Sequence, residues 1–250
     1  MPFLNKEFKV DKIFTFNRVT FIGFGLINSS LARVFKSQSL AKEICAYSRR
    51  KETLLKIKDL NIADFTYDDV KKSVENSDLI VLGVPVGAMS SLVKEFAASL
   101  KNGAIITDVG SIKKGLIDSI SPMLPKGVHF VPGHPIAGTE NSGPESGFED
   151  LFKGRWCILT PTKKTSKEAV QKIEFIWQQA GMKVAIMDAE YHDRVLAITS
   201  HIPHLVAYSI VGTVTDLEEQ LKTEVIKYSA GGFRDFTRIA ASDPVMWRDV

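Results

Sequence analysis

The stretch "HPIAGTENSGPESGF", which begins at His134, holds the clearest candidate for proton chemistry in this sequence. Its prolines and glycines break any helical or strand periodicity, and a loop this long inside a compact domain is commonly functional. An imidazole is neutral near physiological pH and can accept a proton from a hydroxyl group. A lone histidine is more often structural than catalytic, so the choice between these two roles depends on where His134 lies in the fold. The loop follows the apolar stretch "GVHFVPG", which predicts that His134 leaves the carboxyl end of a strand.

Three further segments carry polar side chains that could act beside this histidine. Ser111, in "TDVGSIKKG", follows another expected strand, where its hydroxyl can cap a helix, bind a ligand, or do both. His201 and His204, in "SHIPH", are three residues apart and share one face of a helix, so they either pack or contact a ligand. Arg238, in "FTRIA", is either an exposed helix residue or a bidentate partner for a carboxylate.

A glycine-rich turn near the start of the chain resembles a dinucleotide-binding fingerprint. Gly23 and Gly25 follow the apolar stretch "RVTFI", and Leu26 and Ile27 open a helical pattern. The first glycine permits the tight turn, and the second lets the backbone approach a pyrophosphate at the helix N-terminus. Asn28 stands where the third glycine is usual, which weakens the pattern. The alternative is a plain turn between a strand and a helix.

The second expected strand ends in a basic stretch that bears on which dinucleotide is bound. Its tip reads Tyr47, Ser48, Arg49, Arg50, with no carboxylate to bind the ribose 2′-hydroxyl of NAD. Two guanidinium groups can bind a 2′-phosphate, so the sequence favours NADP over NAD. A solvated basic helix start is the alternative. The fourth expected strand ends at Val84 and Pro85, which we expect beside the nicotinamide ribose.

These segments need a framework, and the apolar pattern predicts one. Short apolar strands alternate with helical stretches up to about residue 187, which indicates a doubly wound α/β sheet of the Rossmann type. Beyond Asp188 the apolar residues recur at helical spacing, and "AEYHDRVLAITSHIPHLVAYSIVGTV" predicts one long helix, which Pro203 either kinks or occupies at a point where a hydrogen bond is lost. We therefore expect a dinucleotide-binding domain over 1–187 and an all-helical domain, apparently short, over 188–250.

Composition narrows the function classes. Hydrophobic residues make up 44% and charged residues 24%, as in globular proteins with a core. The net charge of +3 is small and dispersed, so we expect no nucleic-acid partner. Cys45 and Cys157 lie in apolar runs and are expected to be buried, reduced thiols without metal-site spacing. No signal-like segment and no run near ~18 apolar residues is found, so we expect a cytoplasmic protein without membrane contact.

Taken together, the motifs resemble the prephenate/arogenate dehydrogenase family of tyrosine biosynthesis. The resemblance extends from about Arg18 to the last residue. It rests on "GFGLINSSLA", "DVGSIK", "GHPIAGTENSGPESGFEDLFKGRWCILTP", "SHIPHLVAYSIV" and "GGFRDFTRIAASDPVMWRD". It implies oxidative decarboxylation of prephenate to 4-hydroxyphenylpyruvate, of arogenate to tyrosine, or of both, with hydride transfer to NAD(P)+.

The resemblance also implies residue roles. His134 would be the catalytic histidine, with Ser111 bonded to the same substrate hydroxyl. Arg238 would bind a substrate carboxylate. The remaining substrate-binding positions implied are His204, His201, Ser200, Thr139 and Glu140, the last as a residue that gates or tunes the arginine.

The family's helical domain forms a homodimer, and here it ends at Val250 inside a helix that members continue. We therefore expect a homodimer, weakened if later helices are needed. A non-catalytic nucleotide-binding pseudoenzyme or sensor is the alternative function, favoured by Asn28 and the short helical domain. The sequence does not distinguish prephenate from arogenate as the substrate, and it does not predict whether tyrosine inhibits the enzyme.

Overall fold

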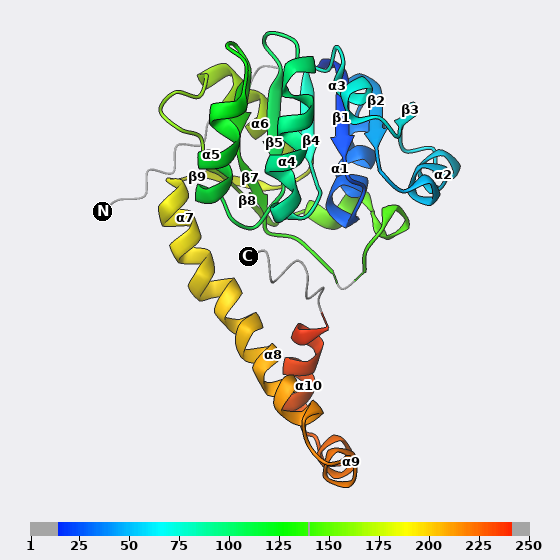
Figure 1. Cartoon of the computed structure of the whole chain (residues 1–250), viewed down its shortest axis with the longest axis vertical. Helices are drawn as coiled ribbons and strands as arrows, with labels where there is room; N and C mark the ends of the chain where they lie inside the picture. The colour runs from blue at the N-terminus through cyan, green and yellow to red at the C-terminus, as the bar shows by residue number, and fades with distance from the viewer. Residues whose placement is uncertain (1–14, 140, 242–250) are drawn as a thin grey trace.

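The computed structural model describes residues 15–139 and 141–241. Within them, an α/β domain is followed by a long helical rod that projects away from it (Figure 1). The larger sheet has the strand order β3-β2-β1-β4-β5-β6, and all its neighbouring strands are parallel. This is the order of dinucleotide-binding folds, so the predicted fold class is confirmed. Its strands are β1 (Phe16–Ile22), β2 (Ala41–Tyr47), β3 (Phe65–Tyr67), β4 (Leu79–Leu82), β5 (Ile105–Asp108) and β6 (His129–Val131).

Helices cover both faces of this sheet, as a parallel sheet requires. One apolar cluster joins α1 and α6 to one face through residues such as Phe35 and Trp177. A second cluster joins α3, α4 and α5 to the other face through residues such as Met89 and Phe96. The helices are α1 (Leu26–Ser37), α2 (Lys51–Asp59), α3 (Val70–Val74), α4 (Val86–Phe96), α5 (Lys114–Ile120) and α6 (Lys167–Gln179).

The last three strands of the domain form a separate small sheet, which the sequence pattern did not separate from the first. β7 (Gly133–Pro135) pairs antiparallel with β8 (Trp156–Leu159), and β8 pairs parallel with β9 (Lys183–Ile186). The chain leaves β6 at Val131 and starts β7 two residues later, so the edge of the large sheet passes directly into the small one. Cys45 in β2 and Cys157 in β8 are buried and free, as predicted.

The helical rod begins with α7 (Ala189–Leu196) and continues through a π-helical turn at Ala197–His201 into α8 (Ile202–Thr215). The predicted long helix is therefore present, and the wider turn ends at His201, two residues before Pro203, where it accommodates the missing N–H and the ring of that proline. α9 (Glu219–Lys227) lies at the far end, and α10 (Gly231–Ala240) folds back along α8 (Figure 1).

Candidate active site

His134 lies on β7, where the large sheet passes into the small one. Its neighbour Gly133 donates its N–H to Asp108 Oδ1 at 3.2 Å, and the Gly133 carbonyl accepts from Lys113 Nζ at 2.7 Å. The end of β5 therefore fixes the backbone of β7. His134 itself is half-buried, paired with Ile158 across the antiparallel ladder. The prediction that this histidine emerges at the carboxyl edge of the large sheet agrees with this position.

A chain of polar contacts runs from His134 into the first helix of the rod. Its Nδ1 lies 2.9 Å from Nε2 of His192, and Nδ1 of His192 lies 2.8 Å from Oδ1 of Asp193. His192 is fully buried, and Asp193 is half-buried. The two ring nitrogens of His192 thus connect an acceptor-only carboxylate with the candidate base.

Asp193 has a second role at the start of α5. Its carboxylate accepts from the backbone N–H of Lys113 at 2.8 Å and of Lys114 at 2.9 Å. The prediction that Ser111 could cap this helix is wrong, because α5 begins three residues later, at Lys114, with Lys113 in the cap position and Asp193 supplying the acceptors. Ser111 stays half-buried in the loop between β5 and α5.

A buried ion pair lies behind His134. Lys113 and Asp108 are both fully buried, and the Lys113 ammonium pairs with the Asp108 carboxylate. Asp108 also accepts from the Gly110 N–H at 2.8 Å, so each charge has further hydrogen-bond partners. Such a pair is retained because breaking it would leave one buried charge uncompensated. It locks the loop that carries Ser111 against the strand that carries His134.

The electrostatic surroundings keep His134 neutral. Burial lowers its pKa well below the ordinary value, and the Lys113 charge, His192 and His201 lower it further, whereas Asp193 opposes the shift. Burial likewise lowers the pKa of His201 and of His204. A neutral imidazole next to solvent-accessible space is suited to accept a proton.

The glycine turn after β1 has the shape that a dinucleotide pyrophosphate needs. Gly23 has φ +79°, and a methyl group there would lie 2.7 Å from Val84 Cγ1, so only glycine fits. A methyl group at Gly25 would meet no atom within 4 Å, which leaves the backbone open towards the N-terminus of α1. No acidic side chain occupies the first turn of this helix. The cradle predicted at Gly23, Gly25, Leu26 and Ile27 therefore fits a bound phosphate.

Asn28 fills the space where a third glycine is usual. It is fully buried, and its Nδ2 donates to the carbonyl of Gly23 at 2.8 Å and lies 3.3 Å from the carbonyls of Ile22 and Val81. Space for it comes from Gly83, where a methyl group would lie 2.3 Å from Asn28 Nδ2. The amide thus ties β1, the glycine turn and β4 together, so the departure from the fingerprint comes with a local compensation.

The other predicted cofactor contacts lie along the same edge. Ser48 is half-buried after β2 and its Oγ accepts from the Arg50 N–H at 3.2 Å, while Arg49 and Arg50 are exposed. Val84 and Pro85 connect β4 to α4. A methyl group at Gly110 would lie 2.9 Å from Val86 Cγ2, so the loop carrying Ser111 lies directly against this connection.

Of the predicted substrate residues on the rod, His201 lies near enough to His134 to lower the pKa of that histidine. Ser200 and His201 lie in the π-helical turn and His204 on α8, all of them half-buried. Arg238 is exposed on α10, which packs along α8 away from the sheets (Figure 1). A hydrogen bond to the backbone of Ile239 links His204 to the same helix. Thr139 is exposed beyond β7, and Glu140 lies outside the described residues.

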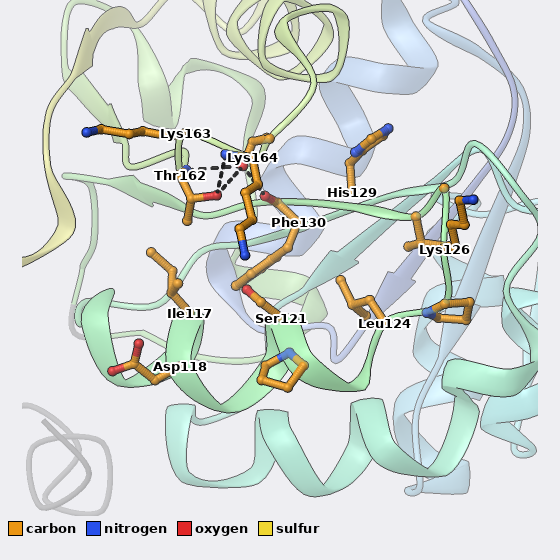
Figure 2. A pocket seen from close by; sticks show the side chains of 15 residues that line it. Ile117, Asp118, Ser121, Leu124, Lys126, His129, Phe130, Thr162, Lys163 and Lys164 are labelled. Carbon is orange, nitrogen blue, oxygen red and sulfur yellow. Dashed lines mark hydrogen bonds between the residues drawn. The ribbon is translucent and has the colours of Figure 1, made fainter.

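A large surface cavity lies elsewhere in the α/β domain. It has a volume of about 830 Å³ and lies between α5, β6 and the loop after β8. Figure 2 shows Ile117 and Ser121 below it and Phe130 and Lys164 above. None of its lining residues is a predicted site residue. The position of this cavity therefore does not identify the candidate active site, whereas the contacts that join His134, His192 and Asp193 do.

Sequence reasoning missed four residues around His134, namely Asp108, Lys113, His192 and Asp193. The adjacent pair His192-Asp193, one turn into a predicted helix, was the available signal. It pointed to polar residues on a helix, but periodicity does not show what such a helix packs against.

Comparison with protein families decides the assignment. The model described as "Prephenate dehydrogenase, nucleotide-binding domain" matches residues 31–186, and "Prephenate dehydrogenase, dimerization domain" matches residues 188–250. The chain belongs to the prephenate dehydrogenase family. It is an oxidoreductase of that family, and the predicted oxidative decarboxylation in tyrosine biosynthesis is confirmed at family level. A non-catalytic sensor is not favoured.

Individual prephenate dehydrogenases agree with this. The cyclohexadienyl dehydrogenase of Zymomonas mobilis is 41% identical over 94% of this chain and 80% of its own length. The prephenate dehydrogenase of Bacillus subtilis is 36% identical, and this chain spans 62% of it. The structure of the Aquifex aeolicus prephenate dehydrogenase with hydroxyphenyl propionate and NAD+ has a TM-score of 0.87 at 36% identity, over 95% of this chain and 82% of that one.

The rod of this chain has an apolar surface. Within the described residues, Ala189–Thr215 is long and apolar enough to cross a membrane, yet only 11% of its most apolar window is buried. Length and composition do not distinguish a membrane span from an apolar subunit interface. This region matches a dimerization domain, and an apolar surface is what a subunit interface needs.

Proposed function

We propose that this dehydrogenase oxidises the ring 4-hydroxyl of prephenate, of arogenate, or of both, with a nicotinamide dinucleotide as hydride acceptor. The observation that carries the proposal is the placement of His134. A neutral imidazole, with Nδ1 committed to His192, lies beside the loop of Ser111, and that loop contacts the connection after β4. Base, hydroxyl and dinucleotide cradle thus belong to one edge of the sheet.

The residues of this chain would move one proton and hold the substrate. Nε2 of His134 accepts the proton of the 4-hydroxyl, with Ser111 as a second hydrogen-bond partner of that oxygen. A bound nicotinamide would accept the hydride from the ring carbon that bears this hydroxyl. When the ring carboxylate leaves as CO2, its electron pair aromatises the ring, and the proton held by His134 returns to the oxygen. The reaction thus consumes no net proton at this residue.

A dicarboxylate substrate needs fixed positive charge, and Arg238 is proposed to supply it, with His204, His201, Ser200, Thr139 and Glu140 around the substrate. Arg238→Gln should raise KM for substrate with a smaller change in kcat, because the contact exists in ground and transition states alike. A desolvated contact is worth on the order of 2–5 kcal/mol. Steady-state kinetics test this, and an unchanged KM would make Arg238 a surface residue.

For the cofactor, we propose a preference for NADP through Ser48, Arg49 and Arg50, since no carboxylate occupies the tip of β2. The Aquifex aeolicus structure contains NAD+, which supports the alternative. Ser48→Asp should shift preference towards NAD, because a carboxylate repels the 2′-phosphate and accepts from a 2′-hydroxyl. A wild type that already prefers NAD at least about tenfold would contradict the proposal.

We also propose that residues 1–187 and 188–250 divide cofactor binding from substrate binding and dimerisation. The homodimer, a cytoplasmic location and the absence of nucleic-acid or membrane partners belong to the same proposal. The division is supported by the start of α7 at Ala189 and by the two matched models, which meet between residues 186 and 188.

The deciding experiment measures kcat/KM for prephenate and arogenate, each with NAD+ and NADP+, by reduced nicotinamide absorbance. Activity with at least one pair supports the proposal, and the ratio among the four assigns substrate and cofactor. A folded protein that reduces neither cofactor with either substrate would overturn it.

A further inference from the structure

We propose that His192 and Asp193 are positioning residues, which hold His134 in the tautomer that has its proton on Nδ1 and a free acceptor at Nε2. The proposal deepens the proposed function, since it explains how His134 becomes the base. It rests on the contacts that join the three side chains, 2.9 Å and 2.8 Å long.

The direction of each hydrogen bond follows from the chemistry of its ends. A carboxylate only accepts, so Nδ1 of His192 carries a proton and donates to Asp193. A neutral His192 then has a bare Nε2, which accepts from His134. Nδ1 of His134 is therefore the donor, and Nε2 is left without a proton. Only this nitrogen can then receive the proton of a substrate hydroxyl.

The opposite arrangement requires a protonated His192, which would donate from both nitrogens. That ring is fully buried. The Lys113 charge lowers the pKa of His134, the ring that contacts His192. The Asp193 carboxylate, which contacts His192, is shared with two backbone N–H groups of α5. The neutral arrangement is therefore the one that the surroundings favour.

The same contacts make the site depend on the rod. Asp193 belongs to α7, whereas Lys113 and His134 belong to the α/β domain. One carboxylate thus fixes both the start of α5, four residues after Gly110, and the orientation of the catalytic imidazole. A rod that shifts relative to the sheets would release His134 from its tautomer.

Nitrogen NMR on the full chain, labelled with ¹⁵N-histidine, tests the tautomer without any need for turnover. His134→Asn assigns the resonances of His134 by their disappearance. We expect a proton on Nδ1 and an unprotonated Nε2 at neutral pH. A His134 protonated at Nε2 alone would overturn the inference. The activity assay tests the proposed function separately, so a failure of the tautomer inference can be distinguished from a failure of the proposed function.

Variants of His192 separate positioning from packing. His192→Phe keeps a buried ring but removes the acceptor, and should lower kcat about 10- to 100-fold with little change in KM, the range for groups that orient a functional residue. His192→Gln restores an acceptor and should recover most of the loss. Equal activity of the Phe variant and the wild type would overturn the inference.

Asp193→Asn should reverse the direction of the hydrogen bonds from residue 193 through His192 to His134, because the amide can donate to His192. His192 would then donate to His134, whose proton would move to Nε2, and kcat would fall by up to about 10⁴-fold, as when a carboxylate that orients a catalytic imidazole becomes an amide. Asp188→Asn is the matched control. It makes the same change at the N-cap of the same helix, where the Asp188 side chain accepts from the backbone N–H groups of Glu190 and Tyr191, and only its backbone carbonyl, which the variant keeps, contacts His192. An unaltered His134 tautomer in a folded Asp193→Asn protein, or an equal loss in the control, would overturn the inference.

Discussion

At the scale of single residues, His134 owes its chemistry to neighbours that come from other parts of the chain. Lys113 comes from the loop after β5, and His192 comes from the first helix of the rod. Replacement of His134 by Asn should lower kcat by roughly 10²- to 10⁴-fold, the usual contribution of a general base, with a smaller effect on KM. Steady-state kinetics with saturating cofactor measure it, and a normal kcat would remove His134 from the mechanism.

The pH profile of the wild type checks the same assignment. The neutral form is the base, so activity is present above the pKa of His134 and is lost as the pH falls through it. Because burial and the Lys113 charge hold this pKa well below 6.5, kcat/KM should stay level as the pH falls through 6.5 and decline only below that. An acid limb centred at or above 6.5 would show that His134 is not held in this environment.

The sequence identifies His134 as a candidate, but it does not identify most of the residues that surround it. His134, Ser111 and the glycines were found because they follow strands, and strand ends can be read from apolar runs. Asp108 and Lys113 were quoted within a motif without a role, since a buried ion pair has no periodic signature. The cap of α5 was assigned to Ser111 because local rules consider nearby residues, whereas Asp193 lies 80 positions from Lys113.

At the scale of elements, the glycine turn and β4 form one packed unit through Asn28 and Gly83. Gly83→Ala would place a methyl group 2.3 Å from Asn28 Nδ2 and should lower the free energy of unfolding. Asn28→Gly should cost about 1–3 kcal/mol through unpaired buried carbonyls. The double variant should cost less than the sum, since each change relieves the other. Chemical denaturation measures this coupling.

Gly25→Ala is the control for that cycle. A methyl group there meets no atom within 4 Å, so stability should change by less than about 0.5 kcal/mol while dinucleotide binding weakens. Strict additivity of Asn28→Gly and Gly83→Ala would mean that the two positions are not coupled.

The order of helices and strands was predictable from the sequence to within a few residues. The small sheet of β7–β9 was not, because pairing partners are set by three-dimensional packing.

At the scale of the whole molecule, the rod carries several of the predicted substrate-binding residues. Arg238 and His204 lie along the rod, and α10 folds against α8 rather than against the sheets (Figure 1). The apolar pattern predicted this helix and its surplus apolar surface. It could not show that the rod projects from the α/β domain, because the partner surface that would cover it belongs to a second chain.

The surplus surface predicts a homodimer built by α7 and α8. Leu205 is 67% exposed on α8, and Ile198 is 69% exposed in the turn before it. Apolar groups at such exposure are stabilised when a second copy covers them, and an isologous interface buries each of them twice. Leu205→Glu would place a carboxylate in that interface on both sides. The variant should dissociate at concentrations where the wild type is dimeric, as measured by light scattering over a dilution series.

Leu55→Glu supplies the matched control, since Leu55 is 59% exposed on α2, away from the rod. It should leave the assembly unchanged. If the rod brings substrate-binding residues to the site only within the dimer, activity of Leu205→Glu should fall with dilution in parallel with dissociation. A wild type that is monomeric and fully active at assay concentration would contradict both points. The apolar rod would then need another role, and each site would have to be complete within a single chain.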